Sequence, residues 1–220
     1  KSPPLISPQG TPSEYLKIKI LDTLQSNTTY IINFGNAVQD NNEGNKLENF
    51  KYVFSTGTYI DSLTTTGSIK DAKLIETPTK INVLLYKIDS TFNDSIVYKK
   101  KPNYVTSTLD TTVFKFTNLR KGNYLMMALQ ESTSDYIFNP VTEKVGFIAD
   151  TIQFPRDSIV KKPIILFKEE QPYKINRGKE FSKGKLEFGF TGDAKNMQIK
   201  VLSKVPDDFK SVSKFEVGKD

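Results

Sequence analysis

The sequence contains no cysteine and no histidine among its 220 residues. Without cysteine the chain cannot form a disulfide framework. Without an imidazole or a thiolate it can form no Ser-His-Asp triad, no Cys-His pair and no zinc site of the usual ligand types. We therefore assign no catalytic, cofactor-binding or metal-binding residues, and expect the chain not to be an enzyme and to need no cofactor.

Long apolar runs are also missing, since the longest stretches, such as Ile164–Phe167, fall far short of the roughly 20 residues of a transmembrane helix. The opening residues Lys1–Pro4 do not resemble the charged and then apolar start of a signal peptide. We expect a membrane to be reached only through an anchor that this sequence does not contain.

The charge balance is basic, with 31 Lys and Arg against 25 Asp and Glu and a net charge of +6. Most of the lysines alternate with apolar residues, as in Leu16–Ile20, which is typical of the solvated face of a half-buried strand. The distribution therefore does not favour nucleic acid as a partner.

Alternation with a period of two recurs along the whole chain and predicts an all-β protein of tandem antiparallel sandwiches. A chain of this length exceeds a single sandwich of about 100 residues. We predict three regions: the C-terminal part of one domain at 1–59, a complete β-sandwich at 60–170, and a partial β-region at 171–220.

The first region contains three predicted strands, and one face of each strand carries large apolar residues. These are Leu16, Ile18 and Ile20, then Tyr30, Ile32 and Phe34, then Phe50, Tyr52 and Phe54. A three-stranded sheet with one apolar face needs a covering layer. We expect the missing strands to lie upstream of Lys1 or to come from another chain.

The second region contains enough alternating segments for a complete sandwich. They are residues 66–71, 80–86, 113–117, 123–129, 145–148 and 163–167. The turn Asn118–Asn123 contains Gly122, which suits a positive φ. We predict that Phe114, Phe116, Tyr124 and Met126 share one core.

The third region shows Leu186, Phe188 and Phe190 on one strand face, and Met197, Ile199 and Val201 on another. About 50 residues are too few to bury a sandwich core. We expect this region to be truncated or docked on its neighbour.

Several polar groups have a structural and a chemical interpretation. The loop Asp40–Asn45 is typical of a turn but has the alternating oxygen donors of a loose calcium loop. Carboxylate catalysis would depend on pairs such as Asp61 with Asp71 or Asp89 with Asp94, which are better explained as turn and strand-end residues.

Two tyrosines give the alternative function, a carbohydrate-binding module. Tyr98 and Tyr104 flank Lys99–Pro102, and exposed coplanar rings there could stack on sugars. Rings turned into a core would remove the basis of this hypothesis.

The order Asn27–Tyr30, Asp40, Gly44-Asn45 and Phe54–Gly57 resembles the second half of the bacterial Ig-like domain of the Big-5, or SbsA-type, family. The segments Gly67–Ala72, Val83–Tyr86, Phe114–Leu119 and Gly122–Tyr124 are similar to the carboxypeptidase-regulatory, or transthyretin-like, Greek-key sandwich, including its hairpin pattern.

The combined order of the two domains is similar to that of predicted cell-envelope lipoproteins, and this resemblance implies that the chain belongs to such a protein. The two resemblances imply a non-catalytic structural or protein-interaction module that is associated with the outer membrane, on its periplasmic or surface side, and whose partners are other envelope proteins.

Overall fold

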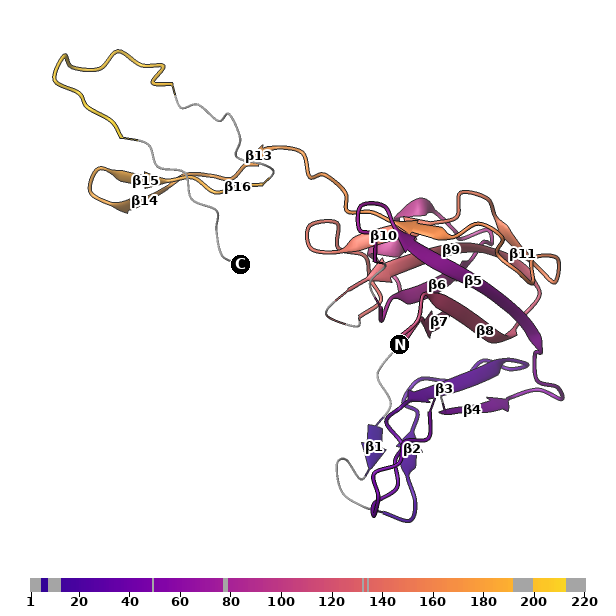
Figure 1. The fold of residues 1–220 in the computed structure, drawn as a ribbon. Coiled ribbons are helices and arrows are strands. Elements are labelled where there is room, and N and C mark those ends of the chain that lie inside the picture. Colours follow the sequence, from indigo (N-terminus) through magenta and orange to yellow (C-terminus); the bar gives the residue numbers. More distant parts are fainter. Residues whose placement is uncertain are drawn as a thin grey trace.

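The computed structural model describes residues 5–7, 13–48, 50–76, 79–131, 133, 135–191 and 200–212. In this part of the chain the structure is built from β-strands and one short 3₁₀ helix, η1 (Asp94–Tyr98), which confirms the all-β prediction. Figure 1 shows an N-terminal group of strands, a central sandwich and a C-terminal arm.

The N-terminal group consists of two small sheets. Strand β1 (Leu5–Ser7) pairs with β2 (Lys17–Lys19), and β3 (Thr29–Gly35) pairs with β4 (Phe50–Ser55), both antiparallel. No described residue of the first 60 is fully buried. The large apolar residues predicted to share faces here are present, but among the described residues no second layer covers them as in a sandwich core.

The central sandwich is made of two sheets that pack face to face. One sheet has the order β10-β9-β6-β7, with β11 also on β9, and the other has the order β12-β5-β8. Their strands are β5 (Leu63–Asp71), β6 (Asn82–Lys87), β7 (Tyr104–Ser107), β8 (Val113–Leu119), β9 (Gly122–Gln130), β10 (Lys144–Phe147), β11 (Ile152–Phe154) and β12 (Ile164–Leu166).

Both sides of the sandwich are held together where one sheet meets the other. On one side the backbones of Val145 and Phe167 exchange two hydrogen bonds of 2.8 Å. On the other side the Thr106 Oγ1 donates to the Lys115 carbonyl oxygen at 2.9 Å. Strand edges that would otherwise expose unpaired backbone groups are thereby partly satisfied.

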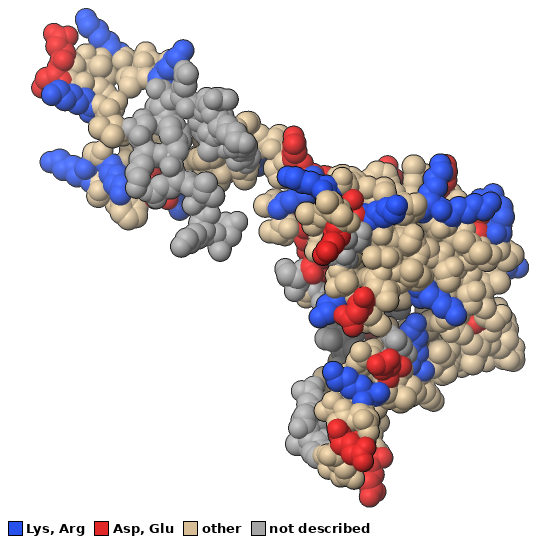
Figure 2. All heavy atoms as spheres, viewed as in Figure 1, with Lys and Arg blue, Asp and Glu red and all other residues tan. Residues whose placement is uncertain are grey.

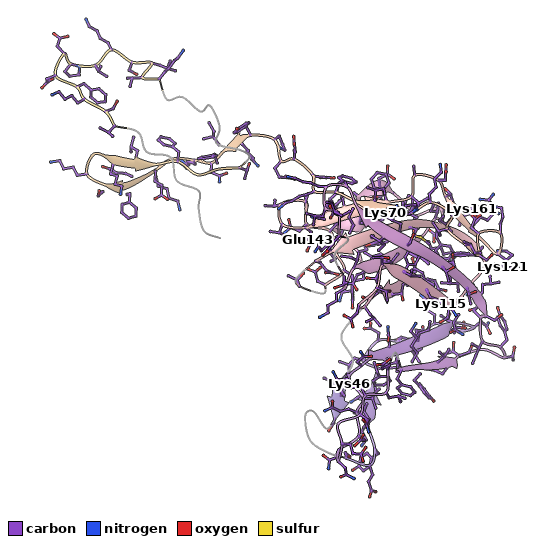
Figure 3. All side chains as sticks on the ribbon, in the orientation of Figure 1. Lys46, Lys70, Lys115, Lys121, Glu143 and Lys161 are labelled. Carbon is purple, nitrogen blue, oxygen red and sulfur yellow. The ribbon has the colours of Figure 1, made fainter. Side chains whose placement is uncertain are left out.

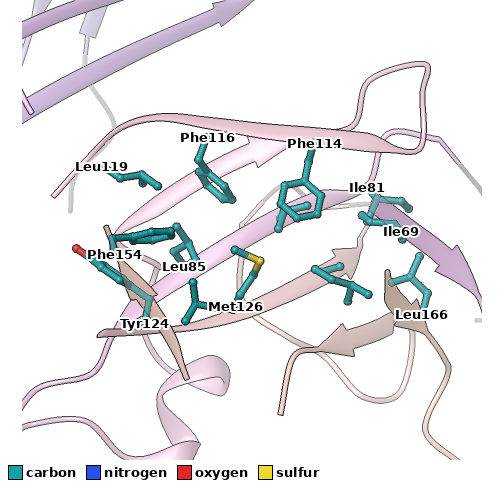
Figure 4. Packing of buried hydrophobic residues seen from close by; sticks show 14 residues of the cluster. Ile69, Ile81, Leu85, Phe114, Phe116, Leu119, Tyr124, Met126, Phe154 and Leu166 are labelled. Atoms are coloured by element: carbon teal, nitrogen blue, oxygen red, sulfur yellow. The ribbon is translucent and has the colours of Figure 1, made fainter. Parts of the chain in front are cut away.

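The inner core lies between the two sheets and confirms the grouping of four residues predicted from alternation. Phe114, Phe116, Tyr124 and Met126 are at most 2% exposed and belong to one cluster (Figure 4). The Phe114 and Phe116 rings meet edge to face, with centroids 6.1 Å apart. Alternation placed these side chains correctly because successive side chains of a strand point to opposite faces of the sheet.

The predicted hairpin between β8 and β9 is wrong. Strand β8 pairs with β5 and strand β9 pairs with β6, so the turn between them crosses from one sheet to the other. Asn118 at φ +57° and Gly122 at φ +149° allow this corner, and the Tyr124 hydroxyl secures it by donating to the Arg120 carbonyl at 3.1 Å.

One pairing is parallel, which the antiparallel prediction did not include. Strand β12 runs parallel to β5, with Ile164 opposite Ile69 and Leu166 opposite Asp71. The first and last strands of the sandwich are therefore neighbours.

A second core covers the outer face of the larger sheet and was not predicted. Leu84 and Tyr86 of β6 and Met127 and Leu129 of β9 are buried there with Phe138. The cover is the segment around η1 and residues 135–143. Because β6 and β9 are buried on both faces, their sequences are continuous apolar runs rather than alternating ones.

Two glutamates fasten the covering segment 135–143. The Glu131 carboxylate accepts hydrogen bonds from Asn82 Nδ2 and from the Tyr136 N–H, each 3.0 Å, and Glu143 Oε2 accepts from the Asn139 N–H at 2.8 Å. Burial raises the pKa of Glu143, and the hydrogen bond from the Asn139 N–H lowers this pKa in part. The loop is thus held by charged side chains as well as by apolar packing.

The C-terminal arm is an antiparallel hairpin, visible at the upper left of Figure 1. It consists of β13 (Lys174–Ile175) with β16 (Phe190–Thr191), and β14 (Lys179–Ser182) with β15 (Lys185–Glu187). The Leu186–Phe190 strand face was predicted, whereas Val201 is in no strand and Met197 and Ile199 lie outside the described residues. No described residue of 172–212 is fully buried.

Truncating Phe116 to Ala should destabilise the sandwich by about 3–5 kcal/mol, because a large buried ring leaves a cavity between the two sheets. Urea unfolding followed by circular dichroism measures this loss. The exposed Val113 on the same strand provides the control, and Val113→Ala should change stability by less than about 0.5 kcal/mol. Equal midpoints for the two variants would contradict the assigned register.

Candidate interaction surfaces

The β3–β4 sheet carries an aromatic face, which we define as Ile32, Phe34, Phe50, Tyr52 and Phe54. Tyr30 stacks on Phe54 with a centroid distance of 5.5 Å, and Phe34 stacks on Phe50 at 5.4 Å. Tyr52 is 56% exposed and the other members are half-buried. So many large rings on one half-covered face suit contact with a further apolar surface.

A polar junction joins this sheet to the sandwich. Thr29 Oγ1 donates to Asp61 Oδ2 and accepts from the Asp61 N–H, both at 2.9 Å. Asn118 Nδ2 donates to the Asp61 carbonyl at 2.9 Å, and Arg120 Nη1 donates to the Asn27 carbonyl at 3.4 Å. The Thr29 bonds join β3 to the linker at Asp61, the Asn118 bond joins this linker to β8, and the Arg120 bond joins the sandwich directly to the start of the β3–β4 sheet. Together they restrict the angle between the β3–β4 sheet and the sandwich.

Sequence reasoning missed this junction. Asn27 and Asn118 both have a positive φ, +49° and +57°, which Asn tolerates better than most residues. In the sequence each Asn was indistinguishable from an ordinary turn residue. Their partners are 93 and 57 residues away, and no local pattern identifies such distances.

Two lysines face each other across the same junction. Burial lowers the pKa of Lys51 on β4, and the positive charge of Lys115 on β8 lowers it further. Figure 3 shows Lys115 on the side of the sandwich nearest the β3–β4 sheet. This repulsion opposes close approach, so the hydrogen bonds of Asp61 work against it.

The carboxylates Asp61 and Asp71 have separate structural roles. Asp61 belongs to the junction. The side chain of Asp71 is 2% exposed and forms an ion pair with Lys144 Nζ at 2.6 Å. It also accepts hydrogen bonds of 2.9 Å from the Lys73 and Leu74 N–H groups. Burial alone would raise the pKa of Asp71, but the Lys144 and backbone hydrogen bonds lower it overall.

The carboxylates Asp89 and Asp94 likewise belong to local structure. Asp89 Oδ1 accepts from the Thr91 N–H at 3.0 Å and from Thr91 Oγ1 at 2.7 Å. Asp94 begins η1 and lines a surface hollow of about 200 Å³ together with Asp150 and Phe92. This hollow is smaller than the roughly 300 Å³ at which ligand pockets usually begin.

The loop Asp40–Asn45 is a turn organised by one carboxylate. Asp40 Oδ1 accepts from the Asn42 N–H at 2.9 Å and the Glu43 N–H at 2.7 Å, and Oδ2 accepts from the Asn45 N–H at 2.9 Å. The hydrogen bond from the Glu43 N–H lowers the pKa of Asp40 most strongly. Burial acts in the opposite direction, and the remaining backbone hydrogen bonds lower the pKa further. Within the described ranges no three acidic side chains gather as a metal site would require.

Tyr98 and Tyr104 do not form the stacking platform of the carbohydrate hypothesis. Tyr98 is 46% exposed and packs against Phe138 of the outer core, at 5.5 Å between centroids. Tyr104 is half-buried against the inner core, with its ring edge-on to Tyr124 at 5.9 Å. The two rings therefore serve opposite faces of one sheet.

Comparison with known families bears on the first of these surfaces. Residues 4–56 match the family model of the bacterial Ig-like domain. This stretch contains β1 to β4 and hence the aromatic face. No curated protein and no solved structure matches the chain.

Domains of this Ig-like kind occur in bacterial surface proteins and are typically non-catalytic. Among the described residues, no helix has the length and apolarity needed to cross a bilayer. The matched part is similar to a bacterial surface or structural module, and the central sandwich lies directly after it.

Replacing Asp61 by Ala should broaden the distribution of angles between the β3–β4 sheet and the sandwich, because it removes the carboxylate that accepts the 2.9 Å hydrogen bond from Thr29 Oγ1. The chain has no cysteine, so spin labels on Asn42→Cys and Lys161→Cys report on the two parts alone. Double electron–electron resonance should give a wider distance distribution in the variant. Thr58→Val, in the same linker, should leave it unchanged, and a narrow distribution in Asp61→Ala would contradict the role of the junction.

Replacing Asp71 by Asn should cost about 1.5–3 kcal/mol near neutral pH, the usual range for a hydrogen bond to a charged group. Since folding lowers the pKa of Asp71, its stabilisation is present above the ordinary Asp pKa and is lost as the pH falls through the folded-state value. Urea titrations at several pH values should show a smaller acid-induced loss in Asp71→Asn than in the parent. Parallel pH profiles would contradict this assignment.

Proposed function

We propose that the chain is a non-catalytic structural or protein-interaction module of a bacterial cell-envelope lipoprotein and forms part of an envelope assembly. The observation that carries the proposal is the aromatic face of the β3–β4 sheet, which lies within the Ig-like match. Its rings form an apolar, half-exposed patch of the composition that is enriched at protein interfaces.

The remaining structure supports a positioning role. The central sandwich, in our proposal a transthyretin-like domain, buries its two cores completely and holds the β3–β4 sheet through Asp61. Of the carboxylates considered for catalysis, Asp61 is used by the junction, Asp71 by an ion pair and Asp89 by a turn, which leaves them poorly suited to general acid–base work. The module would therefore present a surface to a partner and perform no reaction.

The proposed location is the outer membrane, on the periplasmic side or the surface, and the proposed partners are other envelope proteins. This follows from the Ig-like match together with the similarity in domain order to envelope lipoproteins. Binding through a whole face is favoured over strand addition, because exposed lysines along the strands disfavour edge pairing.

The 220-residue chain, immobilised and incubated with envelope extract under mild cross-linking, should retain a specific envelope protein. Tyr52→Asp should reduce the retained amount several-fold, because it places a charge in the aromatic face, whereas Tyr59→Asp, at a similarly exposed tyrosine outside that face, should not. A glycan array that gave saturable binding, abolished by Tyr98→Ala or Tyr104→Ala, without any retained protein would replace this proposal by the carbohydrate one.

A further inference from the structure

We propose that the outer face of the smaller sandwich sheet, β12-β5-β8, lies against a membrane surface of anionic phospholipid headgroups. This inference rests on the proposed envelope location, but it uses neither the aromatic face nor the proposed protein partner. It goes beyond the sequence-based expectation, in which a membrane is reached only through an anchor outside this sequence.

The outer face of this sheet follows from burial and register. In β5 the side chains of Thr65 and Ile69 are buried between the sheets, so their neighbours Thr66, Ser68 and Lys70 point outward. Residues paired with these three share the same face. We define the basic face as Thr66, Ser68 and Lys70 together with their partners Ile159, Ile165, Val113 and Lys115.

Three aliphatic side chains of the basic face are exposed, although a complete sandwich lies beneath them. Ile159 is 66% exposed, Val113 55% and Ile165 42%. They lie on both sides of β5, among the lysines. Apolar side chains that enter the headgroup region, with lysines around them, are how amphipathic surfaces bind anionic membranes.

The segments that form and border the basic face are strongly cationic. Residues 63–71, 113–121 and 156–166 contain seven Lys and Arg against two Asp. Both Asp have cationic partners, since Asp71 pairs with Lys144 at 2.6 Å and Asp157 pairs with Arg156 at 2.9 Å. The unpaired charge on this side of the sandwich is therefore positive.

The strands and loops of the larger sheet do not share this excess. Residues 82–104 and 122–154 contain five Lys against six Asp and Glu. Figure 3 shows Lys70, Lys161 and Lys121 along the upper and right side of the sandwich, and Figure 2 shows a row of blue side chains there. An anionic surface is thus attracted to one side of the sandwich.

The described flanking parts leave the basic face accessible. The β3–β4 sheet approaches only its Lys115 end, where Lys51 lies close enough to feel that charge. The aromatic residues alternate with Lys51 along β4 and lie on the other side of that sheet. The C-terminal arm leaves from the covering segment of the larger sheet, where Gln171 Nε2 donates to the Pro140 carbonyl at 3.1 Å. The basic face is therefore independent of whatever covers the aromatic face.

A lipid surface uses more of this face than a soluble polyanion would. An acidic polysaccharide could pair with the lysines, but Ile159, Ile165 and Val113 would stay in water. At a membrane the same side chains leave water for the boundary between headgroups and acyl chains, which is favourable for apolar surface.

The first experiment measures co-sedimentation of the 220-residue chain with vesicles. Vesicles of phosphatidylethanolamine and phosphatidylglycerol should bind the chain, vesicles of phosphatidylcholine alone should not, and added salt should weaken binding. Lys70→Glu combined with Lys161→Glu should weaken binding by about 25-fold or more, because each lysine near an anionic surface strengthens it about fivefold. Both side chains are exposed, so folding is preserved, and circular dichroism checks it.

A matched control separates the basic face from net charge. Lys99→Glu combined with Lys100→Glu makes the same change of charge at exposed residues that follow η1, beside the larger sheet. This variant should bind the anionic vesicles nearly as the parent chain does.

The second experiment tests whether the aliphatic side chains enter the membrane. The chain contains no tryptophan, so Ile159→Trp provides a single fluorescent reporter. Its emission should shift to shorter wavelength when anionic vesicles are added, because the indole ring leaves water at the membrane interface. Tyr98→Trp, on η1, should show no shift.

Equal binding to both kinds of vesicle would overturn the inference, as would an equal loss of binding in the two double variants or an unshifted emission of Ile159→Trp. Binding of soluble polygalacturonate without binding to vesicles would replace the membrane by an acidic polysaccharide. None of these results affects the retention of an envelope protein by the parent chain and its loss in Tyr52→Asp. The failure of this inference and the failure of the proposed function are thus separate outcomes.

Discussion

The pairing of β6 with β9 is the constraint on which the rest of the structure depends. The two strands align over six residue pairs, and both of their faces are buried. Their inner faces meet β5, β8 and β12, and their outer faces meet η1 and the segment 135–143. A strand buried on both sides tolerates no change of register, since a shift by one residue would exchange the two cores.

That central pair also explains why the sandwich is complete while the flanking parts are not. Its apolar residues find partners on both sides within 110 residues of chain. The β3–β4 sheet and the C-terminal hairpin have one apolar face each and no comparable layer among the described residues. The structure thus separates a self-sufficient centre from two ends whose chemistry suits contact with other surfaces.

The sequence predicted the parts of this fold that depend on local alternation. Phe114, Phe116, Tyr124 and Met126 were placed together because period two decides which face each residue occupies. The sheet to which a strand belongs does not follow from alternation, so the β8–β9 corner was taken for a hairpin. The outer core was missed because the run Val83–Tyr86 is equally apolar on both faces, and its cover is a loop without periodicity. The junction was beyond local patterns, because Thr29, Asp61 and Asn118 are far apart in the chain.

The parallel placement of β12 beside β5 has a mechanical consequence. The chain enters the sandwich at the start of β5 and leaves it after the end of β12, and in a parallel pair these two points lie at opposite ends. A pull on the flanking parts therefore slides the two strands along each other. It loads several backbone hydrogen bonds at the same time, namely those of Thr66 with Ser158 and with Val160 and that of Ala72 with Leu166. Bonds that must break at the same moment resist tension better than bonds that open one after another. The sandwich is thus arranged to transmit force along the chain without unravelling from either end.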